Sequence, residues 1–169
     1  MAMTTSHFTQ ITECDNVLSA DVGFTTDLGE RIAPNLAWGT VVLLFGELGT
    51  GKTVLSRGIA RGLGVSEPVT SPSFTVVQEY PLPENHWLYH LDMYRIGDEE
   101  DALSFGIDDY LYCHNAVTLI EWPERIEGLL LDTQGQSLVE HQTVPIYIEH
   151  MTENTRRISM PRHLVLRMS

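Results

Sequence analysis

The sequence predicts an α/β fold in which helices cover both faces of a central sheet, and three observations predict it. First, apolar residues 41–45 lead into residues 46–53, which match the phosphate-binding loop pattern G-x-x-x-x-G-K-[ST] at every fixed position. Second, apolar residues 116–120 end in an acid, a pattern typical of a buried parallel strand. Third, residues 74–80 and 87–92 are rich in β-branched and aromatic residues and lie close together in sequence, which indicates a β-hairpin.

Length and composition indicate one domain, residues 1–169. The chain is 43% hydrophobic, which is enough to bury a two-sided sheet. Its formal net charge of −13 argues against direct, tight binding of RNA or DNA, although a basic protein partner could bridge it to RNA. Cys14 and Cys113 lack metal-ligand spacing, and neither a secretory leader nor a membrane-spanning apolar run is evident, so we expect reduced thiols in a cytoplasmic protein away from membranes.

The residues before the phosphate-binding loop predict one short strand and one short helix. The strand is expected near residues 10–12. Apolar spacing over residues 22–33 predicts the helix, which Ser19 or Asp21 can cap. Pro34 should end this helix because proline cannot continue a helical hydrogen-bond ladder.

Downstream of the loop, apolar residues at helical spacing predict a helix over residues 54–63 that stops at Gly64. The later elements are predicted from strand-forming runs, turn residues and a run of acids that suits the first turn of a helix. In chain order they are a strand at 74–80, a connector at 81–85, a strand at 87–92, a helix from 98–101 to Tyr110 or Leu111, a strand at 116–120, a loosely ordered segment at 128–142, and a hairpin of 144–150 and 155–160.

The loop at 46–53 predicts binding of a polyphosphate. Backbone N–H groups of a glycine-rich turn and a helix N-terminus converge on the anion, and side chains in place of Gly49 and Gly51 would obstruct them. Lys52 would reach the β- and γ-phosphates, and Thr53 would bind Mg²⁺. Lys52 is the only lysine in the chain, so no Asn-Lys-x-Asp segment that reads guanine is present, and ATP is the expected nucleotide.

Hydrolysis also needs a carboxylate near the metal and a group that orients water. Glu121 closes the more apolar strand, which in an open α/β sheet would deliver it to the crevice that holds the loop, and Asp92 closes a less apolar strand. Either acid could instead be an ordinary surface residue. The hydroxyl-rich segment 70–75 could be a switch that contacts Mg²⁺ or the γ-phosphate, although Ser-Pro-Ser is also common in turns. Arg57 and Arg61 are most simply a solvated helix face.

Four segments together resemble the TsaE (YjeE) family, which comprises the bacterial ATPases of tRNA threonylcarbamoyladenosine synthesis. They are Gly46-Glu47-Leu48-Gly49-Thr50-Gly51-Lys52-Thr53, Thr70-Ser71-Pro72-Ser73-Phe74-Thr75, Leu91-Asp92-Met93-Tyr94-Arg95 and Glu121-Trp122-Pro123. The resemblance runs from about residues 28–31 to about Pro123, and the combination is far more specific than the phosphate loop alone. The C-terminal third matches only in pattern.

The resemblance implies a single P-loop NTPase-type α/β domain with a mixed, largely parallel central sheet plus β-hairpins, in three layers. By that resemblance, Lys52, Asp92 and Glu121 carry catalysis, and Thr53, Asp92 and Glu121 hold Mg²⁺. The residues it places at the nucleotide are Glu47, Leu48, Gly49, Thr50, Gly51, Lys52, Thr53, Val54, Ser71, Ser73, Thr75 and Trp122. Ser73 stands where the family often has threonine and keeps the hydroxyl. Pro34 interrupts the first helix and departs from the family pattern, so adenine contacts from that helix, such as one made by Thr25, are not carried over.

The implied activity is slow, Mg²⁺-dependent ATP hydrolysis required to form the threonylcarbamoyl group on adenosine 37 of tRNA. The resemblance implies action on the TsaB–TsaD heterodimer, with tRNA contacted only indirectly through that basic partner. Two alternatives stay open. A small-molecule kinase would use the same loop for phosphoryl transfer to an acceptor, and a nucleotide-gated binding module would use it without turnover.

Overall fold

The computed structural model describes residues 14–132, 134, 136–139 and 143–166. The strand expected near residues 10–12 lies outside them. In the described part of the chain, no helix is long and apolar enough to span a membrane.

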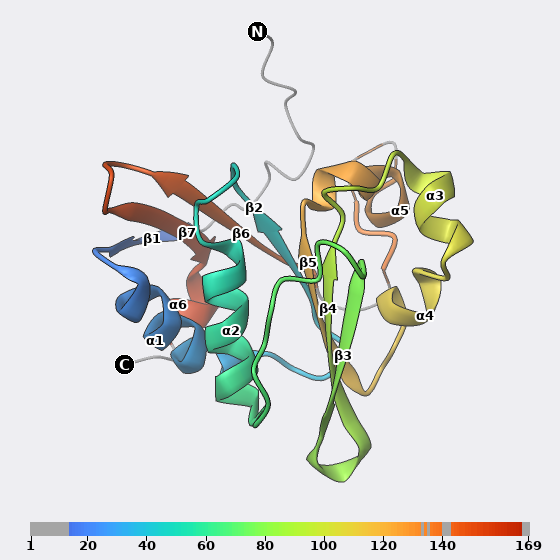
Figure 1. Ribbon diagram of the computed structural model, residues 1–169, viewed down its shortest axis with the longest axis horizontal. Coiled ribbons are helices and arrows are strands. Elements are labelled where there is room, and N and C mark those ends of the chain that lie inside the picture. The colour runs from blue at the N-terminus through green and yellow to red at the C-terminus, as the bar shows by residue number, and fades with distance from the viewer. Residues whose placement is uncertain (1–13, 133, 135, 140–142, 167–169) are drawn as a thin grey trace, which may run out of the picture.

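One mixed sheet forms the centre of the molecule (Figure 1). Its strands are β1 (Cys14–Ser19), β2 (Val41–Phe45), β3 (Val77–Leu82), β4 (His86–Asp92), β5 (Ala116–Glu121), β6 (Thr143–His150) and β7 (Arg156–Pro161). Among the described residues, seven strands lie in the order β1-β7-β6-β2-β5-β4-β3. The middle four are parallel, and antiparallel pairs flank them on both sides. The predicted α/β fold with a mixed, largely parallel sheet is confirmed.

Helices cover both faces of the sheet, which gives three layers (Figure 1). One face packs against α1 (Val22–Ile32), α2 (Lys52–Leu63) and α6 (Arg162–Leu166), and the other against α3 (Glu99–Ser104), α4 (Asp108–Leu111) and α5 (Glu127–Leu130). Short 3₁₀ turns occupy Ala33–Asn35, Pro83–Asn85 and Pro123–Ile126. Successive residues of β2 enter opposite cores, because side chains alternate across a strand. A central strand of this kind is therefore apolar throughout, as residues 41–45 are.

The helix before the loop begins and ends as the sequence predicts. Asp21 caps it, since its Oδ1 accepts a hydrogen bond of 2.8 Å from the backbone N–H of Phe24. Pro34 falls in the 3₁₀ turn directly after the helix. This helix packs along α2 at short range, because Gly29 and Gly58 meet at the crossing and a β-carbon at either would overlap the other backbone. This close packing against α1 fixes the position of α2, the helix that follows the phosphate loop.

The strand predicted at 74–80 is observed as β3, Val77–Leu82, so the prediction starts three residues too early and ends two residues too soon. Residues 73–76 form a turn closed by a 2.7 Å hydrogen bond from the N–H of Val76 to the carbonyl oxygen of Pro72. Val76 has a φ of 69°, a strained conformation for a β-branched residue, so strand-forming composition did not produce a strand there. Pro81, predicted in the connector, belongs to β3, where an edge strand tolerates a proline.

Two further predictions are corrected. The single helix expected from residues 98–101 to Tyr110 or Leu111 is two short helices, α3 and α4, because Gly106 adopts a φ of 83° between them. The segment 128–142 is not loosely ordered at its start, since α5 covers Glu127–Leu130. The hairpins formed by β3 with β4 and by β6 with β7 are confirmed.

Candidate functional site

The phosphate-loop residues 46–53 lie at the carboxyl end of β2, beside the ends of β4 and β5 (Figure 1). Asp92 and Glu121 close those two neighbouring strands and are register partners in them. The side chains of register partners point to the same face of a sheet, so both carboxylates face the layer that contains α2. The sheet thus brings together the two acids and the loop that the sequence singled out.

Glycine is required in the loop where its backbone approaches other atoms or turns left-handed. Gly46 has a φ of 152°, and a β-carbon there would lie 2.5 Å from the carbonyl oxygen of Ile148 on β6. Gly51 has a φ of 110° and directly precedes Lys52, the first residue of α2. The helix begins two residues before the predicted start at Val54. Its first backbone N–H groups therefore belong to the loop itself, as an anion-binding helix N-terminus requires.

Lys52 folds back onto its own loop. Its side chain is buried, and Nζ donates hydrogen bonds of 2.5 Å and 2.9 Å to the carbonyl oxygens of Gly46 and Glu47. Nζ also lies 4.0 Å from the centre of the Trp122 ring, a cation–π distance. Burial lowers the pKa of Lys52, and the nearby negative charge of Glu121 opposes this shift most strongly. The ammonium is thus held at the loop by contacts that a phosphate group could replace.

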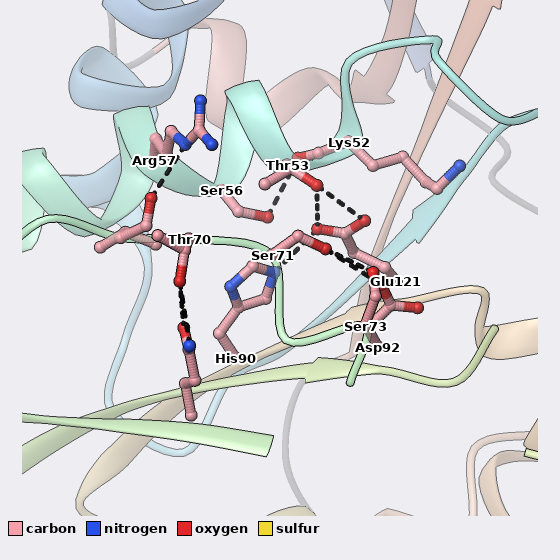
Figure 2. A network of polar contacts seen from close by, with 12 residues as sticks. Lys52, Thr53, Ser56, Arg57, Thr70, Ser71, Ser73, His90, Asp92 and Glu121 are labelled. Carbon is pink, nitrogen blue, oxygen red and sulfur yellow. Dashed lines mark hydrogen bonds and ion pairs between the residues drawn. The ribbon is translucent and has the colours of Figure 1, made fainter. Parts of the chain in front are cut away.

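Thr53 and Glu121 are joined directly across the site (Figure 2). The Thr53 hydroxyl lies 2.9 Å from Oε1 and 3.1 Å from Oε2 of Glu121. The same Oε1 lies 2.8 Å from Nε2 of His90, a residue of β4 that has no exposed surface. Glu121 is buried as well, at 3% exposure. An acid this deeply placed is not an ordinary surface residue, and its position fits metal-binding or water-orienting chemistry.

Asp92 holds the segment proposed from sequence as a switch. Its Oδ2 accepts a 2.7 Å hydrogen bond from Ser73 and lies 3.3 Å from the hydroxyl of Ser71 (Figure 2). Its Oδ1 accepts a 3.0 Å hydrogen bond from the backbone N–H of Tyr94. The two serine hydroxyls are themselves 2.7 Å apart. Thr75 differs from them, since it is exposed and is not among the residues that line the cleft. The structure therefore brings two of the three predicted hydroxyls to the site.

A cleft of about 500 Å³ opens over these residues. Its walls combine the loop, α2, the 71–73 segment and the ends of β4 and β5. The lining residues are Leu48, Gly49, Gly51, Lys52, Thr53, Val54, Arg57, Ser71, Ser73, Asp92, Tyr94, Arg95, Glu121 and Trp122. Trp122 reaches it because its left-handed backbone, with φ 59° and ψ 47°, turns the chain sharply after β5. Glu47 and Thr50 lie on the other side of the loop, where they line a separate hollow with Tyr147.

A third, smaller hollow of about 260 Å³ adjoins the loop on the side of α1. Asp21, Thr25 and Arg156 line it together with Gly49 and Gly51. The Thr25 hydroxyl is 2.7 Å from the hydroxyl of Ser19 and 3.2 Å from the carbonyl oxygen of Asp21, so its contacts are made within the protein. The hollow thus adjoins the phosphate loop on the side away from Asp92 and Glu121.

The donor atoms of the cleft suit Mg²⁺ bound together with a polyphosphate. Hydroxyl and carboxylate oxygens of Thr53, Asp92 and Glu121 are the hard ligands that Mg²⁺ prefers. Within the described residues, no group of three or more His, Cys, Asp or Glu side chains has the geometry to hold a metal ion alone. Sites for Mg²⁺ commonly use one or two carboxylates and complete the shell with phosphate oxygens and water. The residues present fit that arrangement.

Sequence reasoning gave no site role to four of these side chains: His90, Arg57, Tyr94 and Arg95. His90 stands in a largely apolar strand. The only sequence signal for it is that a polar residue occupies the position between Leu88 and Asp92 on the buried face of that strand. Arg57 was interpreted as part of a solvated face, and it is exposed, but its Nε donates a 2.9 Å hydrogen bond to the carbonyl oxygen of Val69 and it lines the cleft. Arg61 forms an exposed 2.6 Å ion pair with Glu30 on α1.

The chain is similar to known proteins over most of its length. The family model "Threonylcarbamoyl adenosine biosynthesis protein TsaE" matches residues 19–158. Two proteins named tRNA threonylcarbamoyladenosine biosynthesis protein TsaE illustrate the relatives. The one from Synechocystis is 39% identical over 121 residues, 64% of this chain and 70% of its own. The one from Treponema pallidum is 35% identical over 136 residues, 80% of this chain and 92% of its own.

A solved structure shares the fold. The crystal structure of YdiB from Bacillus subtilis aligns with a TM-score of 0.71 at 26% identity, over 92% of this chain and 94% of YdiB. The similarity therefore includes the C-terminal third, where the short motifs did not reach.

Proposed function

We propose that this chain, which belongs to the TsaE family, is a Mg²⁺-dependent ATPase of tRNA threonylcarbamoyladenosine formation. Membership in the family supports a role in the biosynthesis of this tRNA modification. The observation that supports ATP hydrolysis is the direct contact between Thr53 at the start of α2 and Glu121 at the end of β5, at 2.9 Å. It unites a phosphate loop, a metal-binding hydroxyl and a buried acid in one cleft, which are the parts that phosphoryl transfer to water needs.

The proposed roles follow from the positions of the side chains. The nucleotide with its metal would supply the bond to be broken and neutralise the charge that develops on the γ-phosphate. Lys52 would exchange the carbonyl oxygens of Gly46 and Glu47 for phosphate oxygens. Thr53 would bind the metal, and Glu121 would bind it or orient the attacking water. Asp92 would hold the metal or its waters in place of the serine hydroxyls that it binds here.

The proposed partner is the TsaB–TsaD heterodimer, and the proposed location is the cytoplasm. A chain with a net charge of −13 repels tRNA, so a basic partner would carry the phosphate contacts to RNA. The switch segment supports dependence on a partner. Val76 holds a strained backbone at its end, and Phe74 within it is 84% exposed. Both features suit a segment that rearranges when γ-phosphate and partner bind.

The test is multiple-turnover phosphate release from ATP by the isolated chain and by the chain with TsaB–TsaD. We expect the isolated chain to be near the assay floor and the pair to raise turnover. Ser73→Ala should reduce that rise, because it removes a cleft hydroxyl with which the switch segment would contact Mg²⁺ or the γ-phosphate. Ser66→Ala is the matched control, an exposed serine outside the cleft. A full rate in the isolated chain, unaltered by a pair that does not bind it, would contradict the proposal.

The same assay separates the two alternatives. A small-molecule kinase would transfer phosphate only when an acceptor is added and would yield a phosphorylated product instead of free phosphate. A nucleotide-gated module would bind ATP and the pair without sustained release. Turnover well beyond one phosphate per protein, with no acceptor present, would exclude both.

A further inference from the structure

His90 is a buried polar side chain at the site to which the mechanism above gives no task. It lies on β4 between Leu88 and Asp92 on the face that packs against α2, and its side chain is fully buried. Leu88 and the neighbouring Leu119 of β5 belong to the apolar core on that face. Packing alone would favour a third aliphatic residue at this position.

The ring of His90 makes one polar contact and leaves one nitrogen without any. Nε2 lies 2.8 Å from Oε1 of Glu121, and because a carboxylate only accepts, Nε2 carries the hydrogen. Nδ1 is buried and has no hydrogen-bond partner among the described residues. A buried polar atom without a partner costs free energy, so the histidine carries a stability cost at this position.

We propose that His90 is a positioning residue for Glu121. Its Nε2–H holds Oε1, so the carboxylate stays turned toward Thr53 and the cleft, with Oε2 left for a metal-bound or attacking water. The inference rests on the proposed function, because Glu121 needs a fixed orientation only if it acts on the nucleotide. Figure 2 shows the imidazole beneath the carboxylate and the Thr53 hydroxyl on its other side.

His90 is better suited to this task than Thr53, which also contacts both carboxylate oxygens. Thr53 is the proposed metal ligand, so its hydroxyl would give up these hydrogen bonds when the metal binds. His90 has no such second task. It pairs in register with Leu119, two residues before Glu121, and the β4–β5 pairing thus fixes the ring relative to the carboxylate. The histidine contact is the one that persists through the reaction.

The activity test compares His90→Leu with His90→Gln in the complex with TsaB–TsaD. The leucine variant removes the donor, so we expect kcat to fall by about tenfold or more while KM and the Kd for MgATP stay within about twofold. The glutamine variant retains an N–H within reach of Oε1 and should recover most of kcat. Leu88→Val is the control, a fully buried change on the same strand without a polar contact.

The outcomes separate positioning from packing. An unchanged kcat in His90→Leu would overturn the proposal, and so would equal losses in the leucine and glutamine variants or a comparable loss in Leu88→Val. Equal increases in the Kd for MgATP and losses in kcat would assign His90 to binding, which also overturns it.

A second measurement needs neither nucleotide nor a His90 variant. ¹⁵N NMR of the nucleotide-free protein should find the His90 ring hydrogen on Nε2, and Glu121→Gln should shift that resonance because its hydrogen-bond acceptor changes. A ring with its hydrogen on Nδ1 and none on Nε2, or a resonance that Glu121→Gln leaves in place, would overturn the contact itself. Failure of the proposed function is distinguishable, since a wild-type chain that neither binds nor hydrolyses ATP would still give the NMR result.

Discussion

The polar residues of the cleft bind one another in pairs that a nucleotide and metal would have to rearrange. Lys52 binds two loop carbonyl groups, Thr53 binds Glu121, and Asp92 binds two serines. Each group is thereby satisfied, as buried polar atoms generally are. The cost of breaking these pairs is part of the cost of binding. Removing single members should therefore have different effects on binding and on turnover.

Thr53→Ala and Glu121→Gln should separate the two roles. The alanine variant loses the hydroxyl proposed to bind the metal and should weaken Mg²⁺-dependent ATP binding. The glutamine variant keeps the shape of the acid, so binding should be spared while turnover falls by roughly 10²-fold or more.

Tryptophan fluorescence reports ATP binding, because ATP would draw Lys52 Nζ away from the Trp122 ring, whose centre is 4.0 Å from it here. Trp122→Phe serves as its control, since Trp38 and Trp87 add background. Normal hydrolysis by Glu121→Gln would refute the role given to that residue.

At the residue scale, the sequence predicts those site positions that strand ends and a fixed motif determine. Asp92 and Glu121 follow from the rule that parallel strands point their carboxyl ends to one crevice. The sequence could not predict that Ser71 and Ser73 reach the cleft while Thr75 does not. This difference depends on a turn that includes the strained backbone of Val76. His90 could not be predicted either. A single histidine in an apolar strand carries no periodic signal, and its partner is 31 residues away.

At the element scale, the helix pair α1 and α2 supports the loop. Gly58 on α2 packs directly on the backbone of α1 near Thr26 and Gly29. Close approach of this kind lets two helices share a long contact, and it leaves no room for a side chain. Because α2 starts at Lys52, a displacement of this pair would move the phosphate-binding residues.

Gly58→Ala should therefore destabilise the fold, by about 1–3 kcal/mol from overpacking against α1. The natural comparison is Gly23→Ala in the first turn of α1, where a β-carbon meets only the Asp21 side chain at 3.2 Å. That variant should stay within about 1 kcal/mol of the wild type. Denaturant unfolding of both variants measures the difference. Equal stabilities for the two would show that the helices can separate without cost.

A tyrosine links the other helix layer to the edge of the sheet. The hydroxyl of Tyr110 on α4 donates a 2.7 Å hydrogen bond to Glu79 on β3. This bond, together with burial, raises the pKa of Tyr110 from 10.0 to about 12. The folded state then holds a proton that the unfolded state releases first. The resulting stabilisation is complete below the unfolded pKa of 10.0 and is lost as the pH rises through about 12.

Tyr110→Phe should accordingly flatten the alkaline pH dependence of stability. The wild type should lose more free energy of unfolding than the variant between about pH 9 and pH 11.5. Tyr112→Phe, on the neighbouring exposed tyrosine, should behave as the wild type does. Parallel losses in the wild type and Tyr110→Phe would mean that the hydrogen bond to Glu79 does not stabilise the folded protein in solution.

Elements were predictable where pattern and environment agree. The strand at 41–45 matches β2 because a strand buried on both faces must be apolar throughout. The helix expected after the acidic run divides at Gly106, since acids mark a helix start but say nothing about its length. The segment from 128 onward has no apolar periodicity, and its short helix depends on packing of Leu130 in the core.

At the scale of the whole molecule, the fold places an open cleft at the carboxyl ends of the parallel central strands in a strongly acidic protein. Exposed Leu48 and Phe74 stand at the loop and the switch segment, beside the cleft. A site so arranged can be completed by a second macromolecule, and the net charge of −13 favours a basic one. Family membership, the cleft and the charge thus support the same proposal from independent directions.

A crystal structure with a non-hydrolysable ATP analogue and Mg²⁺ would show whether the loop and the two acids form a MgATP site. We predict that Lys52 Nζ leaves the carbonyl oxygens of Gly46 and Glu47 and binds phosphate oxygens at about 2.7–2.9 Å. Thr53 Oγ1 should lie about 2.0–2.1 Å from the metal, with Glu121 or Asp92 at that distance or one water away. Phosphates bound away from residues 46–53, or a metal that neither acid approaches, would contradict the account.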